Sequence, residues 1–157
     1  MYGKITSATN GNLYFTTNDP CYFYEYNLTG TLGQISGSTW VKRACGTNVE
    51  DKAGQHATQG PNGTVLIGTA IRGSLFSYDP VANAIREYGV IDPPADNPTC
   101  TSPYYCYRYV YTLQADASYA YLGMRDANTN YWSPVMVRLS DGQQTPCFQA
   151  NNSLPGL

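Results

Sequence analysis

The strongest constraint on the fold of this chain is a repeat within its own sequence. Residues 4–30 align without a gap with residues 56–82, at a shift of 52 residues. In this alignment Asn10-Gly11 falls on Asn62-Gly63, and the apolar positions of the segment that follows superpose. Self-similarity of this kind predicts supersecondary units of about 50 residues that lie side by side, each burying its apolar face on the next.

A third copy follows at a shift of 55, where residues 119–123 match residues 64–68. Its next strand, residues 136–140, matches residues 75–79 only after about six extra residues, which we assign to a longer turn at residues 126–132. We therefore expect a single domain over residues 1–157 with three repeats. Their approximate bounds are residues 4–50, 56–99 and 107–150.

Each copy is predicted to form strands, because glycine and proline interrupt nearly every window in which a helix would fit. The longest stretch free of both, residues 104–122, alternates with a period of two. The alternation places one set of apolar side chains on the same side of a strand: Tyr107, Tyr109, Tyr111 and Leu113. A turn at residues 116–118 and a second aromatic strand through Tyr119 and Tyr121 follow.

Four short antiparallel strands in about 50 residues are typical of a propeller blade, and propellers close with 4 to 8 blades. The predicted fold is therefore all-β, with antiparallel four-stranded blades in a partial or oligomer-completed β-propeller. The alternative is a β-sandwich whose hairpins are similar by coincidence. Three blades are fewer than a closed ring needs, so we expect either a fragment of a longer parent chain that supplies the missing blades or a homo-oligomer.

The composition excludes several classes of partner. Tyrosine occurs 15 times, charged residues make up only 13% of the chain, and 11 acidic residues outnumber 9 basic ones. A protein that binds nucleic acid through phosphate contacts needs a concentration of positive charge, so we expect no nucleic-acid partner. No apolar run approaches the roughly 20 residues that span a bilayer, so we expect no membrane partner.

The cysteines point to an oxidising compartment. There are five of them, Cys21, Cys45, Cys100, Cys106 and Cys147. We expect a short disulfide loop between Cys100 and Cys106 and a second pair between Cys21 and Cys45, which leaves Cys147 over. No spacing suits zinc, and the chain has a single histidine, so we expect no metal and no cofactor. Together with few lysines and many Tyr, Asn, Thr and Gly residues, this usage predicts a secreted or cell-surface protein. Three N-x-S/T sequences are also present, but so short a motif occurs by chance, and the alternative is that they are unmodified turn residues.

Three segments carry a resemblance to a known family: Leu13-Tyr14-Phe15-Thr16-Thr17, residues 60–69 and Phe76-Ser77-Tyr78-Asp79-Pro80. They resemble blades of the streptogramin-lyase-like and related secreted β-propellers. The resemblance implies a propeller fold, but its motifs describe how a blade is built and not what it binds. Where the lyases continue into a glutamate of their metal site, this chain has Thr17, and its second copy has Thr69.

His56 and Tyr111 are the candidate catalytic residues. His56 lies at a distance before its turn similar to that of the lyases' catalytic histidine, at the start of a strand expected to line the central channel. A histidine beside a tyrosine provides a base and an acid for β-elimination of a polysaccharide. The alternative is a histidine that is hydrogen-bonded at the channel mouth and has no chemical role.

A second group of candidates suits ligand binding. It consists of Tyr105, Tyr107, Arg108, Arg125 and Trp132. Aromatic faces stack on sugar rings, and arginine binds a carboxylate through two parallel hydrogen bonds. The alternative is that these tyrosines pack between blades and that the arginines are solvated.

We therefore expect an extracellular binding or scaffold module with glycan as its ligand, rather than an enzyme. One alternative is a propeller-type polysaccharide lyase or hydrolase that uses His56. Another is a self-assembling structural protein in which exposed blade edges pair between molecules.

Overall fold

The computed structural model describes seven stretches of the chain, and the fold is all-β. They are residues 5–16, 22–27, 40–44, 53–70, 73–91, 108–126 and 132–147. All strand pairs in them are antiparallel, and these stretches contain no α-helix. The only helical element within these seven stretches is the single 3₁₀ turn η1 (Pro61–Gly63).

The strands form three four-stranded sheets, each from one continuous part of the sequence. The N-terminal sheet contains β1 (Ile5–Ser7), β2 (Leu13–Thr16), β3 (Tyr22–Tyr26) and β4 (Trp40–Ala44). The middle sheet contains β5 (Ala53–Gln59), β6 (Val65–Ala70), β7 (Ser74–Asp79) and β8 (Ala84–Val90). The C-terminal sheet contains β9 (Arg108–Ala115), β10 (Tyr119–Asp126), β11 (Trp132–Arg138) and β12 (Gln144–Pro146).

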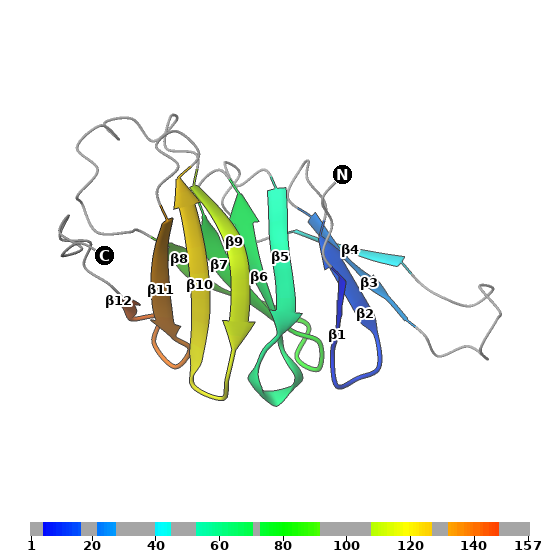
Figure 1. The fold of residues 1–157 in the computed structure, drawn as a ribbon. Coiled ribbons are helices and arrows are strands. Elements are labelled where there is room, and N and C mark those ends of the chain that lie inside the picture. Colours follow the sequence, from blue (N-terminus) through cyan, green and yellow to red (C-terminus); the bar gives the residue numbers. More distant parts are fainter. Residues whose placement is uncertain are drawn as a thin grey trace, which may run out of the picture.

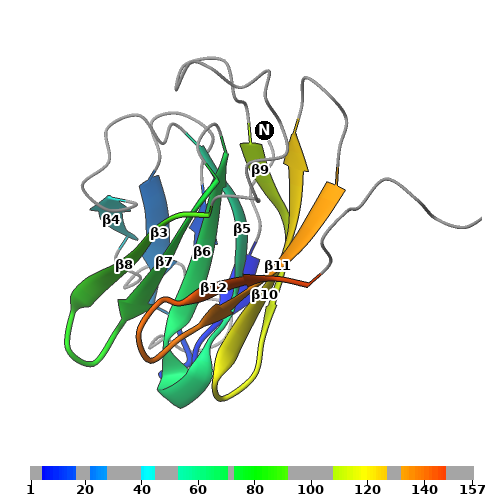
Figure 2. The same ribbon diagram turned by 90° about the vertical axis from the view of Figure 1, so that its left-hand side faces the viewer.

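In every sheet the spatial order of the strands follows the sequence, so each sheet is a simple meander. The middle sheet lies between the other two, and its first strand β5 lies beside β1 on one side and β9 on the other (Figure 1). The tight turns that join β1 to β2, β5 to β6 and β9 to β10 lie together at the lower end in this view. Figure 2 shows the strongly twisted course of the strands within each sheet.

The pairing register of the N-terminal sheet recurs in the middle sheet 52 residues later. Tyr14 pairs with Thr6 and Glu25, and Leu66, which lies 52 positions after Tyr14, pairs with Thr58 and Ser77. All the other printed pairs of β1 with β2 and of β2 with β3 shift in the same way. The gap-free sequence alignment is therefore also a structural one for these three strands.

In the C-terminal sheet the register differs from the alignment expected between residues 75–79 and 136–140. Tyr121 is the counterpart of Leu66, and its partner on β11 is Met136, so Met136 corresponds to Ser77 and not to Leu75. The connection between β10 and β11 is therefore longer by about four residues instead of six. The alignment was misplaced because short apolar strands with alternating side chains match at two registers that differ by two residues.

The turn residues account for the short connections. Asn62 and Gly63 both have positive φ, as expected for an Asn-Gly hairpin turn, while in the first turn only Gly11 does. Asp116 shapes the predicted turn at residues 116–118, because its Oδ1 accepts hydrogen bonds from the backbone N–H groups of Ser118 and Tyr119 at 2.7 and 2.8 Å.

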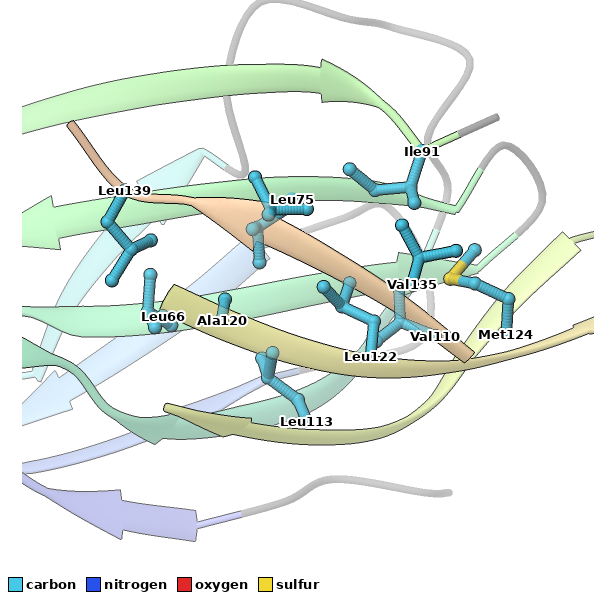
Figure 3. Close-up of a cluster of buried hydrophobic side chains, with 11 residues drawn as sticks. Leu66, Leu75, Ile91, Val110, Leu113, Ala120, Leu122, Met124, Val135 and Leu139 are labelled. Carbon is cyan, nitrogen blue, oxygen red and sulfur yellow. The ribbon is translucent and has the colours of Figure 1, made fainter. Parts of the chain in front are cut away.

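The core consists of two layers, one on each face of the middle sheet. Toward the N-terminal sheet, Val65, Ile67, Phe76 and Tyr78 pack around Tyr14. Toward the C-terminal sheet, Leu66, Leu75 and Ile91 meet the inner face of β9, β10 and β11 (Figure 3). Seven residues of those strands belong to the cluster, together with Leu139 directly after β11: Val110, Leu113, Ala120, Leu122, Met124, Val135 and Val137. The central strands β6 and β7 of the middle sheet are thus buried on both faces, and each outer sheet packs on only one described sheet.

A glycine permits the close approach of the middle and C-terminal sheets. A Cβ atom on Gly68 would lie 2.3 Å from Cγ1 of Val110, much closer than two carbon atoms can pack. The absence of a side chain at Gly68 lets β6 and β9 come together, because glycine is the one residue that leaves that space to its neighbour.

The alternation expected along residues 107–113 is wrong at one position. Val110 pairs with Met124 and Thr112 pairs with Gly123, so Tyr111 is an extra residue in a β-bulge. Val110 and Leu113 are buried against the middle sheet, whereas Tyr111 and Thr112 are both exposed. The bulge shifts the alternation by one residue, which is why Leu113 does not share a side with Tyr111.

Candidate functional site

Three candidate residues from three strands meet on the outer face of the C-terminal sheet. The rings of Tyr111 (β9) and Trp132 (β11) meet edge to face, with centroids 5.0 Å apart and an interplanar angle of 79°. The guanidinium carbon of Arg125 (β10) lies 5.7 Å from the Tyr111 ring centroid and 5.8 Å from that of Trp132. We call these three residues the aromatic–arginine cluster.

The strand register places each member of the cluster. Arg125 pairs directly with Trp132, so their side chains leave the sheet on the same side. Tyr111 has no partner in the ladder, because it is the extra residue of the β9 bulge. A bulge bends its strand and re-aims the extra side chain, and here it turns Tyr111 toward the Arg125–Trp132 pair.

The cluster is open to solvent and carries a positive charge. Tyr111 is 46% exposed and Trp132 is 48% exposed, which is unusual for two large aromatic side chains in contact. The guanidinium group of Arg125 lies beside both rings, so the cluster combines N–H donors with apolar aromatic surface. The arrangement can therefore bind a planar or ring-shaped ligand that carries hydroxyl or carboxylate groups.

The middle sheet has small residues at the equivalent places. Matching the pairs around Leu66 to those around Tyr121 makes Ala70 the counterpart of Arg125. The ladder of β6 and β7 ends at the pair Gly68–Leu75, and the same register continued by two residues makes Gly73 the counterpart of Trp132. Ala70 and Gly73 are buried. The middle sheet therefore has no counterpart of the bulky cluster, and its close packing on the C-terminal sheet does not need one.

Tyr121 lies on the same face, closer to the tight turn between β9 and β10, and its hydroxyl is hydrogen-bonded to that turn. The Tyr121 hydroxyl donates a hydrogen bond of 2.7 Å to Oδ2 of Asp116, and this bond is the main reason why the pKa of Asp116 lies below its usual value. The same contact raises the pKa of Tyr121. Tyr119 packs beside Tyr121, with ring centroids 6.4 Å apart. The aromatic surface therefore continues from the cluster toward the turn.

The other predicted ligand-binding residues fall at the edge of the described part or beyond it. Tyr105 and Tyr107 lie outside the described residues. Arg108 begins β9, where it pairs with Asp126, and its side chain is outside the described part. Of the cysteines, Cys147 is described and is an exposed free thiol. The disulfide candidates lie outside the described residues: Cys21, Cys45, Cys100 and Cys106.

His56 and Tyr111 are placed on different sides of β9. His56 is half-buried on β5 and pairs with Gly68, whose side faces Val110 and the inner face of the C-terminal sheet. Tyr111 leaves the opposite, outer face of that sheet. The register makes Thr112 the counterpart of His56, and Tyr111 the counterpart of the extra residue Gln55 in the β5 bulge. The acid–base pair expected from the sequence stays a prediction, and this geometry does not favour it.

A cavity of about 350 Å³ lies at the junction of the middle and C-terminal sheets, near the tight turns. Arg86 on its wall donates hydrogen bonds to the backbone oxygens of Leu139 and Ser140 at 2.9 and 2.7 Å, and its guanidinium carbon lies 4.9 Å from the centroid of the Tyr88 ring. Oδ1 of Asp79 accepts the N–H groups of the turn that follows. These side chains connect the sheets and shape a turn, so the cavity is a weaker candidate than the cluster.

A buried polar network that no sequence motif indicates lies on the face of the N-terminal sheet that packs on the middle sheet. Oε1 of the buried Glu25 accepts hydrogen bonds from the Tyr14 hydroxyl at 2.6 Å and from Nδ2 of Asn12 at 2.8 Å. Burial, followed by the hydrogen bond to Glu25, raises the pKa of Tyr14 to about 12. No local motif signals this network, because the partners lie on different strands and meet only through the register.

Two searches of the described residues bear on other functions. No group of three or more His, Cys, Asp or Glu side chains in them is arranged to hold a metal ion. Nor does this part of the chain contain a helix of the length and hydropathy needed to cross a membrane. Comparison of the chain with protein-family models, with curated proteins and with solved structures found no match.

Proposed function

We propose that this protein is an extracellular glycan-binding module of the β-propeller type, and that the aromatic–arginine cluster contacts the sugar. The observation that carries the proposal is the position of Arg125 against both Tyr111 and Trp132 on an exposed sheet face. Three sheets whose first strands lie side by side are the arrangement expected of consecutive propeller blades, and the register shared by the N-terminal and middle sheets supports it.

The chemistry of the cluster favours a sugar with an acidic group. The C–H faces of a pyranose ring are apolar and pack on an exposed aromatic face, while the ring edge presents hydroxyl groups. The exposed Trp132 and Tyr111 supply the apolar surface. Arg125 supplies N–H donors that match a carboxylate in two parallel hydrogen bonds. A uronic acid satisfies both requirements, whereas a neutral sugar satisfies only the first.

Binding is tested with polysaccharides that differ only in charge. Oligogalacturonate and its methyl-esterified form have the same rings, and only the first carries carboxylates. In a Trp40→Phe background Trp132 is the single tryptophan, so its fluorescence reports occupancy of the cluster. We expect the emission to change with oligogalacturonate and the apparent affinity for the esterified form to be at least about tenfold weaker, since a lost charged hydrogen bond costs about 1.5–3 kcal/mol.

Two variants test the aromatic contact and the charged contact separately. Binding is measured here by calorimetry, because replacing Trp132 removes the fluorescence signal. Trp132→Ala should weaken binding of both forms at least tenfold, whereas Arg125→Gln should weaken only the acidic form. Val81→Ser, in an exposed turn away from the cluster, is the matched control. Absence of binding across a wider panel of neutral and acidic polysaccharides would refute the proposal. Release of unsaturated sugar ends, detected by ultraviolet absorbance, would show a lyase instead.

A further inference from the structure

Each outer sheet presents an apolar face that no other described sheet covers. On the C-terminal sheet it is the face of Tyr121 and Met136, and on the N-terminal sheet it is the face of Phe15 and Tyr24. The rings of Phe15 and Tyr24 stack with centroids 5.3 Å apart and an interplanar angle of 22°. Ile5, on the same side as these rings, is 70% exposed.

On the C-terminal sheet, the uncovered positions are ones that the other two sheets bury. Tyr121 is the counterpart of Leu66 and of Tyr14 by strand register. Leu66 and Tyr14 are both fully buried, each by the sheet that follows, whereas Tyr121 is 40% exposed. The difference lies in what covers the residue, since all three positions carry a large side chain on the same face.

The N-terminal sheet presents the complementary set of positions. By register Phe15 is the counterpart of Ile67 and Leu122, which are buried against the sheet that precedes each of them. Ile5 in turn is the counterpart of Leu113, which is 1% exposed at the internal junction. Within the chain, two such pairs of faces pack together, between the N-terminal and middle sheets and between the middle and C-terminal sheets. The two uncovered faces carry the residues equivalent to the two sides of these junctions.

We propose that a second copy of this chain covers these faces, with the N-terminal sheet of one copy packed on the C-terminal sheet of the other. The inference extends the propeller arrangement proposed above. A contact between two different faces is heterologous, so it either closes into a ring or continues as a filament. Two copies would supply six sheets, which lies within the range of 4 to 8 that closes a propeller, and both junctions would then be equivalent.

The internal junctions indicate which part of the C-terminal face is needed. At the positions of Arg125 and Trp132 the middle sheet carries the small, buried residues Ala70 and Gly73, so the bulkier side chains would hold the junction between copies more open at this end than the internal ones and leave the cluster accessible to a ligand. Leu66, the counterpart of Tyr121, is in contrast a fully buried member of the core cluster at the internal junction. Substitutions of Tyr121 and Ile5 therefore test the assembly of two copies, whereas substitution of Trp132 tests the binding of the ligand.

The oligomeric state is measured by sedimentation equilibrium on the full chain, whose mass is 17.2 kDa. We expect twice this mass for the wild type and a monomer for both Tyr121→Asp and Ile5→Asp, because each places a charge in both junctions. Val81→Asp, at an exposed apolar residue on neither face, should stay dimeric. Far-ultraviolet circular dichroism checks that the variants are folded; both changed side chains are substantially exposed, so folding should survive.

Mixing the two monomeric variants tests whether the contact joins different faces. A mixed dimer of Tyr121→Asp and Ile5→Asp has one junction free of substitutions, so a dimer of intermediate affinity should reappear. A back-to-back dimer would respond to only one of the two substitutions and would not be restored by mixing. A wild-type monomer at 0.1 mM would overturn the proposal. A monomer that still binds oligogalacturonate through Trp132 would overturn assembly alone and leave the proposed function standing.

Discussion

The middle and C-terminal sheets have the same strand order and each has a bulge in its first strand. They differ in the burial and the type of side chain at equivalent positions. In the middle sheet β6 and β7 are buried nearly throughout, and both faces carry apolar side chains. In the C-terminal sheet β11 alternates between buried and more exposed residues, and its outer face carries aromatic and charged groups. The apolar side chains that both sheets carry are therefore the ones needed for packing. The aromatic–arginine cluster is present only in the C-terminal one of these two sheets and is not needed for packing.

The largest expected contrast is between equivalent residues on the two second strands. Leu66→Ala should lower the free energy of unfolding by about 2–5 kcal/mol, because a fully buried leucine leaves a cavity between two packed sheets. Tyr121→Ala should cost only a small fraction of this, since Tyr121 already contacts solvent. Urea denaturation at a protein concentration below that of any self-association provides the measurement. Equal losses would mean that the outer face is covered within a single chain.

Much of this comparison follows from the sequence. The 52-residue shift predicted four-strand units, and the Asn-Gly and Asp turns predicted where the hairpins close. Arg125 and Trp132 were chosen as ligand candidates because their residue types suit a sugar, and the structure brings them together. The position of Tyr111 was not predictable, because an extra residue in one strand changes no local propensity. The burial of a tyrosine also depends on whether a neighbouring sheet covers it. The alternation of residues within one strand does not predict this.

The two glycines at equivalent places on β6 and β10 provide a second contrast. A Cβ atom on Gly68 would meet the Val110 side chain of another sheet at 2.3 Å, whereas one on Gly123 would meet the Oγ1 atom of Thr112 at 2.4 Å. Thr112 lies on the exposed face and can rotate away, but Val110 is held in the core. Gly68→Ala should therefore cost about 1–3 kcal/mol by overpacking, and Gly123→Ala clearly less.

Thermal unfolding of both glycine variants measures this difference. The control is Gly68→Ala combined with Val110→Ala, in which the smaller partner makes room for the added methyl group and should recover part of the loss. If Gly68→Ala alone does not change the stability, the close approach of β6 and β9 does not require a glycine at this position.

The smallest contrast is between Tyr14 and Tyr121, equivalent tyrosines that each donate a hydrogen bond to a carboxylate. Glu25 is buried, so Tyr14→Phe should cost about 1–3 kcal/mol at neutral pH by leaving its carboxylate one donor short. Asp116 is exposed, so water replaces the hydroxyl in Tyr121→Phe. That variant should leave stability nearly unchanged and should raise the pKa of Asp116 toward its ordinary value, which carboxyl chemical shifts in an NMR titration would show.

The pH dependence of the Tyr14 effect has a definite sign. The folded pKa of Tyr14 is about 12, against an ordinary value of 10.0, so above pH 10 the unfolded chain loses a proton that the folded chain retains. The stability that this neutral phenol contributes is complete below pH 10 and is lost as the pH rises toward 12. The difference between wild type and Tyr14→Phe in urea denaturation should therefore shrink between pH 10 and 12, while Tyr121→Phe shows no comparable change. A constant difference would mean that the phenol of Tyr14 titrates like an exposed one, and that the N-terminal and middle sheets are not packed closely around it.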